Sequence, residues 1–322
     1  MPDTKTFSFQ IPLLLLCCLV AVTGLGSLAN SFPLLGLLTH FRFHLSWGLF
    51  FCLWSLWGMR RSLMWKLGLV SMLFNLLQVA PVYWDNPSER WQASQENESL
   101  KLVSFNLLWT NQQYEEVQHY LEQEQADVMV LLELTPVWAE MLNPLINQYP
   151  HRMVLPDPEY NGMALLSKYP LDSASWIWPG NSSSPVAYSE VNFNEQVIRI
   201  VGMHPLAPTR IHKQQRRDEQ LEALGKLLAD QASPLVMVGD YNITTHHPAL
   251  RHMQSRLNLQ DSRKGIGRQP SWPVSLGIWG LPIDHCLVSP SVKVLRRELG
   301  PILGSDHRPL IVELALHQKA DG

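Results

Sequence analysis

The first quarter of the chain contains almost no charged side chains. From Ile11 to Trp84 there is no acidic residue and there are few basic ones, whereas charged residues make up 16% of the whole chain. Soluble proteins usually contain about 25% charged residues, and the deficit here is confined to this segment. Because an apolar stretch of about 20 residues can cross a bilayer, the sequence predicts a membrane anchor.

Three apolar runs predict three transmembrane helices, so residues 1–86 are assigned to the anchor. The first run, Ile11 to Ala29, could by itself be a signal peptide. Two further runs rich in aromatic residues argue against that, at His44 to Met59 and at Leu63 to Trp84. The middle run is short and could be a tight hairpin partner, so two or four spans stay open.

Basic residues predict the orientation of this anchor. Arg60 and Arg61, with Lys66 nearby, lie between the second and third runs, whereas the first loop holds only Arg42. Cytoplasmic loops are enriched in Lys and Arg, which places Arg60, Arg61 and the amino terminus in the cytoplasm. Three crossings then leave everything after Trp84 on the extracytoplasmic side of a multi-pass membrane protein.

The remainder of the chain has the charge density of a soluble domain. Residues 87–100 are polar and predict a linker, and residues 101–318 predict a folded domain. The order of predicted elements is strands, helix, strands, helix, strands, which favours an α+β sandwich flanked by helices. The net charge of −3 gives no global polycation for non-specific nucleic-acid binding, and the four cysteines show no zinc or disulfide spacing.

The stretch Pro234 to Asn242 (PLVMVGDYN) joins a buried strand to functional side chains. Asp240 and Asn242 leave the strand two residues apart, so at a period of two both would point to the same side. A carboxylate can bind a hard cation or accept a proton, and a carboxamide can donate to a phosphoryl oxygen. A simple strand-to-loop turn explains the tetrapeptide about as well, because Gly, Asp and Asn favour turns.

Five more strand ends carry polar residues of the same kind. Each alone has an ordinary structural explanation, such as a carboxylate at the solvent boundary or a structural histidine. They are, in chain order, Asn106, Glu133, His204, Asp284 and Ser305-Asp306-His307. Together with Gly239-Asp240-Tyr241-Asn242, this series resembles the endonuclease/exonuclease/phosphatase superfamily, which includes DNase-I-like and exonuclease-III-like nucleases, neutral sphingomyelinases and inositol-polyphosphate phosphatases. The resemblance covers about Lys101 to Leu316.

The resemblance implies a four-layered α/β/β/α sandwich that hydrolyses phosphoesters with Mg²⁺ or Mn²⁺. Glu133, with Asn106 beside it, would bind the cation, as hard cations prefer oxygen ligands. Asp306 would share that metal or hold a second one. Asp284 and His307 match the carboxylate–imidazole pair of the family, in which the carboxylate fixes the tautomer of the ring and raises its basicity.

Three further roles follow from the same resemblance. Asp240 would orient or deprotonate the attacking water, and Asn242 and His204 would contact the phosphoryl oxygens; which group is the base stays open.

Many nucleases of the superfamily carry an acid two residues after the first Asn, where this sequence has Leu108, which argues against repair-nuclease activity. His285 would point to the opposite face of a regular strand and is predicted to be structural.

The leading functional hypothesis is a membrane-tethered, metal-dependent phosphodiesterase, nuclease or phosphatase. The tether favours a lipid head group or another surface phosphoester as substrate. Nucleic acid is favoured by the family and by the basic turn from Arg210 to Arg217. The alternative is a catalytically silent binding or sensing module, because a fold does not fix a function. The anchor carries too few charges for an ion path, and no protein partner is predicted.

Overall fold

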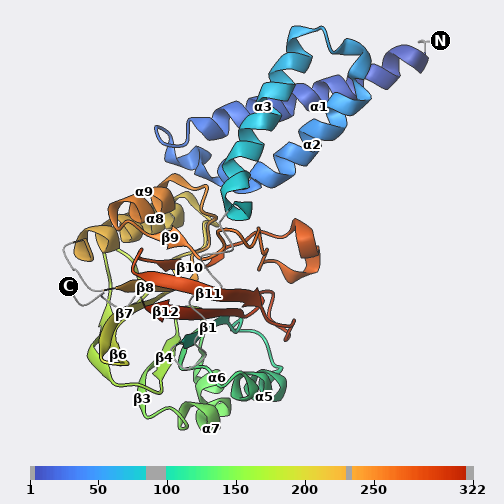
Figure 1. The fold of residues 1–322 in the computed structure, drawn as a ribbon. Helices are drawn as coiled ribbons and strands as arrows, with labels where there is room; N and C mark the ends of the chain where they lie inside the picture. Colours follow the sequence, from blue (N-terminus) through green and yellow to red (C-terminus); the bar gives the residue numbers. More distant parts are fainter. Residues whose placement is uncertain (1–3, 85–98, 230–233, 317–322) are drawn as a thin grey trace.

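The computed structural model describes residues 4–84, 99–229 and 234–316. A group of helices lies against one side of a β-sandwich (Figure 1). The predicted linker falls almost wholly outside the described residues. Helices occupy the three predicted apolar runs: α1 (Thr4–Ser27), α2 (Arg42–Ser55) and α3 (Leu63–Val79). The first of these runs toward the sandwich, the second runs away from it and the third returns (Figure 1).

The three helices pack through apolar side chains and through two buried hydrogen bonds. Their common core is Leu16, Leu49, Cys52, Leu53 and Leu56. The Arg42 guanidinium donates to Asn75 Oδ1 at 3.0 Å, and Asn75 Nδ2 donates to Thr23 Oγ1 at 3.0 Å. In this way one residue from each helix meets in a buried polar network. Buried polar groups need such partners, because an unpaired one is costly in an apolar environment.

Within the described chain, the stretches 10–27 and 63–83 are long and apolar enough to cross a membrane. Their outward side chains are exposed and apolar, for example Leu14, Val70 and Leu77. The 14 residues of α2 span only about 21 Å at 1.5 Å per residue, against a hydrocarbon thickness of about 30 Å. The number of crossings therefore stays a prediction.

Two six-stranded mixed sheets form the sandwich, counted over the described residues. The first contains, in spatial order, β11 (Val292–Leu299), β12 (Leu310–Leu316), β1 (Leu100–Asn106), β2 (Val128–Leu132), β4 (Met163–Ser167) and β3 (His151–Leu155). The second contains β5 (Leu171–Ile177), β6 (Val186–Phe193), β7 (Gln196–Met203), β8 (Leu235–Asp240), β10 (Asp284–Val288) and β9 (Gln260–Asp261). Alternate residues of the two sheets interdigitate between them, among them Leu102, Val130, Ile200 and Val238.

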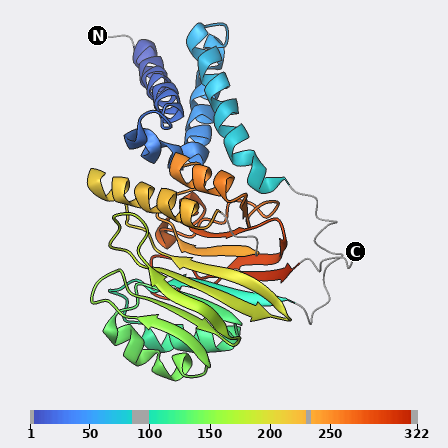
Figure 2. The same cartoon turned by 90° about the vertical axis from the view of Figure 1, so that its left-hand side faces the viewer.

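Helices cover the outer face of each sheet, so the predicted four-layered α/β/β/α arrangement is confirmed. Short helices α5 (Tyr114–Glu124), α6 (Pro136–Met141) and α7 (Asn143–Ile146) pack on the first sheet. Helices α8 (Ile211–Leu227) and α9 (Pro248–Arg256) pack on the second. Figure 2 shows that α8 and α9 also separate that sheet from the N-terminal helices.

Short irregular helices tie the N-terminal helices to the sandwich. In η1 (Pro33–Phe41), His40 Nδ1 lies 3.1 Å from Thr244 Oγ1. The Gln214 side chain donates to the Pro33 carbonyl oxygen at 2.6 Å. Beyond α3, in η3 (Ala80–Tyr83), the Val82 carbonyl accepts from the Gly267 N–H at 2.9 Å. The connection between α1 and α2 and the end of the helical group are thus bonded to α8 and to loops of the sandwich.

The predicted order of strands and helices agrees with the structure in outline, but β3, β5, α6 and α7 were not predicted. Tyr169 and Pro170 lie between β4 and β5, which belong to different sheets. Strand β3 was not predicted, because its sequence (HRMVL) does not alternate between polar and apolar residues and buries only Met153 fully. Antiparallel pairing with β4 holds β3 in the sheet although few of its side chains are buried.

Strand pairing brings distant polar residues to one rim of the sandwich. Strands β1 and β2 run parallel, with Asn106 beside Leu132, so Glu133 follows directly at the same edge. In the second sheet β8 and β10 run antiparallel and place Asp284 opposite Asp240. Just before Asp240, Gly239 has φ +144°, and a Cβ there would overlap the Met203 carbonyl oxygen of β7. Only glycine fits this approach.

Substitution of this glycine tests the packing of the rim. We expect Gly239→Ala to lower the free energy of unfolding by about 2 kcal/mol or more, because the added methyl group forces β7 and β8 apart and the backbone into a strained region. That corresponds to a fall of about 6 °C in melting temperature. Gly24→Ala is the control, since nothing lies within 4 Å of its added Cβ. Equal melting temperatures for the two variants would contradict this packing.

Candidate active site

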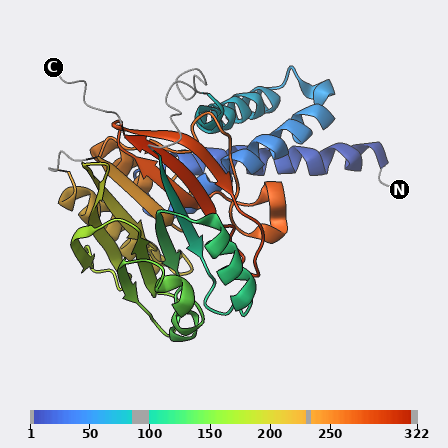
Figure 3. The same cartoon turned by 60° about the horizontal axis from the view of Figure 1, so that its bottom comes forward.

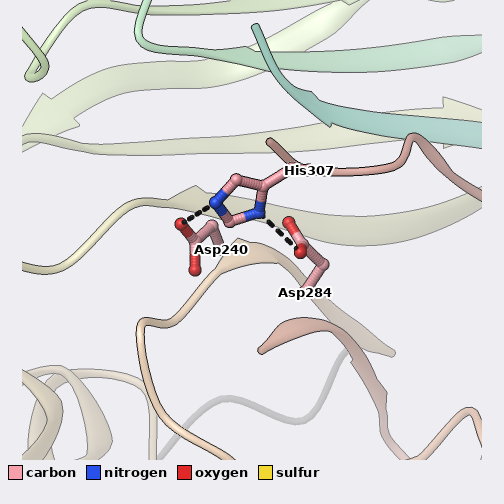
Figure 4. Close-up of side chains that lie close together, drawn as sticks. All are labelled: Asp240, Asp284 and His307. Carbon is pink, nitrogen blue, oxygen red and sulfur yellow. Dashed lines mark hydrogen bonds and ion pairs between the residues drawn. The ribbon is translucent and has the colours of Figure 1, made fainter. Parts of the chain in front are cut away.

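His307 lies between two carboxylates at the rim of the sandwich (Figure 4). Its Nδ1 is 2.9 Å from Asp284 Oδ2, and its Nε2 is 3.5 Å from Asp240 Oδ2. All three side chains are buried. Asp240 ends β8, Asp284 begins β10, and His307 lies in the loop that leads into β12. The predicted carboxylate–imidazole pair therefore exists, and a second carboxylate faces the other ring nitrogen.

A second set of side chains shares Asp240 with this pair. Asn106 Nδ2 donates to Glu133 Oε1 at 3.0 Å and to Asp240 Oδ2 at 3.2 Å. His204 Nε2 lies 3.4 Å from Asp240 Oδ2 and 3.8 Å from Glu133 Oε1. Its Nδ1 faces the Tyr160 carbonyl oxygen at 3.2 Å. The two sheets thus each supply half of one continuous polar network.

Unusual backbone conformations hold part of this network. Leu108, Glu133 and Asn242 have φ values of +61°, +57° and +55°. Non-glycine residues rarely adopt this region, and such strain concentrates at functional sites. The conformation of Glu133 lets its Oε2 accept the Trp109 N–H at 2.9 Å. The unfavourable backbone conformation of Glu133 therefore accompanies a carboxylate that is held in one position.

Neighbouring loops fix the two members of the imidazole pair. Ser305 Oγ donates to the Asn106 carbonyl at 2.7 Å and accepts the His307 N–H at 3.0 Å. Ser271 Oγ accepts the Asp284 N–H at 3.2 Å. The role of Ser271 was not predicted, because these bonds run between backbone and side chain across residues far apart in the chain.

Asn242 lies differently from the sequence expectation, and Asp306 lies at the edge of the site. Strand β8 ends at Asp240, so the period-two argument does not extend to Asn242. The Asn242 N–H donates to Asp240 Oδ1 at 2.8 Å, and its side chain donates to the Pro205 carbonyl at 3.0 Å. Asp306 is 43% exposed and accepts the Trp272 Nε1–H at 2.7 Å. It lies at the edge of the cluster, with Oδ1 4.0 Å from His307 Nε2.

His285 points away from the cluster, in agreement with its predicted structural position. Its Nε2 lies 2.7 Å from the Ile243 carbonyl, and its ring packs edge-on against Tyr241. Burial is the main cause that lowers the pKa of His285 to about 4, so the ring is neutral. The adjacent Asp284 faces the opposite side of β10, as strand geometry requires.

The carboxylates change the protonation of both imidazoles at the rim. Burial disfavours a charged His307, but Asp284 and Asp240 outweigh it and raise its pKa to about 10. Burial likewise opposes the charge of Asp240, yet His307 and His204 lower its pKa to about 2. The folded pKa of His307 lies above its unfolded value of about 6.5. The interaction therefore stabilises the fold fully below pH 6.5 and is lost as the pH rises through about 10.

The residue types at the rim fit a hard divalent cation. Three buried carboxylates, of Glu133, Asp240 and Asp284, lie in one network whose compensating charges are imidazolium groups. Asp240, Asp284 and His307 each offer a ligand atom within 4.8 Å of the others. His307 would offer a nitrogen donor, however, and hard cations prefer oxygen donors. Glu133 and Asn106 are therefore the better-suited ligands.

Comparison with known proteins identifies the family. The profile of the Endonuclease/Exonuclease/phosphatase family matches residues 103–307, well over half of the chain, so the protein belongs to that family. Its members are hydrolases that act on phosphoesters, typically with a divalent metal. Comparison with curated protein sequences gave no match.

Solved structures share the sandwich at low sequence identity. The human Nocturnin catalytic domain with bound sulfate is 17% identical, with a TM-score of 0.58 over 68% of this chain and 95% of that one. A humanized D. rerio TDP2 is 17% identical, with a TM-score of 0.56 over 67% and 98%. A family protein from Beutenbergia cavernae DSM 12333 is 18% identical, with a TM-score of 0.55 over 68% and 72%. At these identities the likeness establishes the fold alone.

Replacement of one carboxylate tests the electrostatics of the pair. In Asp284→Asn we expect the pKa of His307 to fall well below about 10, because the charge nearest its Nδ1 is lost while the amide can still accept a hydrogen bond. Histidine-labelled NMR titration of the metal-free full chain in detergent measures this. Asp306→Asn is the matched control and should shift the pKa much less. Equal shifts in the two variants would contradict the assigned geometry.

Proposed function

We propose that this protein is a membrane-tethered phosphoester hydrolase that uses Mg²⁺ or Mn²⁺. The observation that carries the proposal is the single network at the rim, in which Asp240 contacts both the His307 pair and the Glu133–Asn106 pair. Hydrolysis of a phosphoester needs an oriented water, compensation of phosphoryl charge and protonation of the leaving group. The network offers a group for each need.

The low pKa of Asp240 keeps its carboxylate ionised, and this favours it as the group that orients the attacking water. The raised pKa values of His307 and His204 favour both rings as cations toward phosphoryl oxygens. In this proposal Asp284 is a positioning residue that holds the His307 ring. Asn242 keeps one side-chain N–H beyond the bond to Pro205, which is available to a phosphoryl oxygen.

The cation would be held by Glu133 and Asn106, with Asp306 as an added or second ligand. When bound, it would polarise a phosphoryl oxygen and compensate the charge that develops on it. The Glu133 side chain is only 11% exposed and already fixed by two hydrogen bonds, which favours a preformed ligand. The half-exposed Asp306 suits a weaker position at the mouth of the site.

The tether would hold this site next to a bilayer on the extracytoplasmic side. Support comes from the exposed apolar surfaces of α1 and α3 and from the arrangement of the helices. The turn that carries Arg60 and Arg61 lies at the end of the helical group farthest from the sandwich (Figure 1). A cytoplasmic position for these arginines therefore puts the sandwich on the other side.

The geometry argues less for a nucleic-acid substrate than the sequence did. Within the basic turn from Arg210 to Arg217, the Arg217 guanidinium is buried and pairs with Asp218 at 2.8 Å, so it cannot reach a phosphate backbone. Lys213 lies over the Tyr160 ring, on the His204 side of the rim. Arg210 and Arg216 are exposed on the same turn, so it offers three rather than four basic side chains for contacts with a phosphate backbone.

Activity measurements test the proposal. We expect the detergent-solubilised full chain to hydrolyse a soluble phosphodiester such as bis(p-nitrophenyl) phosphate with Mg²⁺ or Mn²⁺, and chelation to abolish turnover. Asp240→Asn and His307→Gln should each lower kcat by about 100-fold or more, because each removes an oriented proton-transfer or charge-compensating group. His252→Gln, on the exposed side of α9, is the control. Full activity in Asp240→Asn, or turnover that survives chelation, would refute the assignment.

A further inference from the structure

A cavity of about 470 Å³ lies between α2 and α3, close to the sandwich. Its walls are almost entirely apolar and aromatic, with Phe43, Trp47 and Phe50 on α2, Leu76 on α3, and Tyr83 and Trp84 beyond it. Ser46 is the one hydroxyl among the non-aromatic lining residues described, and it already donates to the Arg42 carbonyl at 2.9 Å. We call this cavity the inter-helix groove. Its volume lies within the range of roughly 300–1,000 Å³ that is common for small-molecule sites.

The apolar lining of the inter-helix groove favours a lipid chain as its occupant. Half of the lining residues belong to α3 and η3, in the stretch 63–83 that is apolar enough to cross a membrane. In a bilayer the surrounding medium is hydrocarbon, and a groove without free polar groups is filled by a lipid chain rather than by a head group or water. Tyr83 and Trp84 are exposed at its sandwich end, where aromatic residues usually mark the head-group level. A chain in the groove would thus have its head group toward the sandwich.

A loop of the catalytic domain connects the groove with the active site. At its tip, the Trp279 ring packs 5.6 Å from that of Phe43 and 6.5 Å from that of Trp47. The Trp279 carbonyl also lies 2.7 Å from His44 Nε2. At its base, Trp272 pairs with Leu281 in an antiparallel bridge. Residues 271–281 form this bridging loop, which lies beside the N-terminal helices in both Figure 1 and Figure 3.

The base of the bridging loop belongs to the active-site rim. Trp272 Nε1 donates to Asp306 Oδ2 at 2.7 Å, and the Trp272 ring lies 6.3 Å from the His307 ring at a tilt of 37°. The Val274 N–H donates to the Asp306 carbonyl at 3.0 Å. One short loop therefore contacts the wall of the groove at one end and residues of the rim at the other.

Two features of the loop suit the surface of a bilayer. Its tip exposes Leu276, Ile278 and Trp279 beside the membrane helices. Arg268, just before the loop, lies with its guanidinium 3.7 Å from the centre of the Phe43 ring and donates to the carbonyls of Ile278 and Gly280. A fixed cation between an apolar groove and a phosphoesterase site complements the charge of a phospholipid head group.

We propose that the inter-helix groove binds a hydrocarbon chain of a membrane phospholipid whose phosphodiester is the substrate of the rim. This inference rests on the proposed hydrolase function and adds the substrate class. In the reaction, the water oxygen forms a new P–O bond and one ester P–O bond breaks. The water gives up one proton, and the departing alcohol oxygen gains one. The products are an alcohol and a phosphomonoester.

The test compares two neighbouring leucines of α3 in the full chain. Leu76 lines the groove and is 45% exposed, whereas Leu77 does not line it and is 71% exposed, so both accept a larger side chain without repacking a core. Each variant, Leu76→Trp and Leu77→Trp, is reconstituted in nanodiscs of dioleoyl phosphatidylglycerol and phosphatidylcholine with Mg²⁺. Turnover of each lipid is measured beside that of bis(p-nitrophenyl) phosphate.

We expect Leu76→Trp to lower the ratio of lipid to soluble turnover about tenfold, which is the effect of losing contact with about two methylene groups. Leu77→Trp should leave this ratio at the wild-type value. As a readout independent of turnover, a phosphatidylcholine with a diazirine in its acyl chain should crosslink to peptides of α2 and α3 in wild type. The crosslink should fall in Leu76→Trp and persist in Leu77→Trp.

The outcomes separate the inference from the proposed function. If wild type hydrolyses the soluble phosphodiester but neither lipid, or prefers single-stranded DNA to both lipids, the lipid inference is overturned and the hydrolase function stands. Equal effects of the two tryptophan variants on both readouts also overturn it. If neither soluble nor lipid phosphodiester is hydrolysed, the proposed function itself fails, and the lipid inference that rests on it falls as well.

Discussion

Three carboxylates buried at one rim of a β-sandwich are the feature on which the rest of this structure depends. Removing such charges from water costs several kcal/mol each unless they are paired. Here Glu133, Asp240 and Asp284 share two imidazoles and one carboxamide, and the response is visible in the high pKa of His307. An arrangement that stability alone would not favour is typical of a site that binds a cation and an anion together.

The sandwich makes this concentration of charge possible because both sheets end their strands at the same rim. Parallel pairing of β1 with β2 supplies Asn106 and Glu133, and antiparallel pairing of β8 with β10 supplies Asp240 and Asp284. The tight contact at Gly239 closes the second sheet directly behind Asp240. Apolar residues of both sheets pack around these strands and position the side chains at their ends.

The sequence predicted most of this rim but not its supports. Asn106, Glu133, His204 and Asp284 were expected at one rim, and the structure places them there. Each follows or begins an apolar run, and the order of such motifs along the chain can be read from the sequence. The left-handed turn at Asn242 and the Trp272–Asp306 bond depend on tertiary contacts that no local pattern encodes. The same holds for the bonds that join η1 and η3 to the sandwich, since their partners lie about two hundred residues away in the chain.

The central claim is that one rim holds a cation and a phosphorus centre together. Anomalous scattering from crystals of the full chain, grown with Mn²⁺ and a nonhydrolysable phosphodiester analogue, tests it most directly. The account predicts an ion at coordination distance from Glu133, with the phosphorus of the analogue beside His307 and His204. An ion bound elsewhere on the chain, or a phosphorus atom outside this rim, would contradict it.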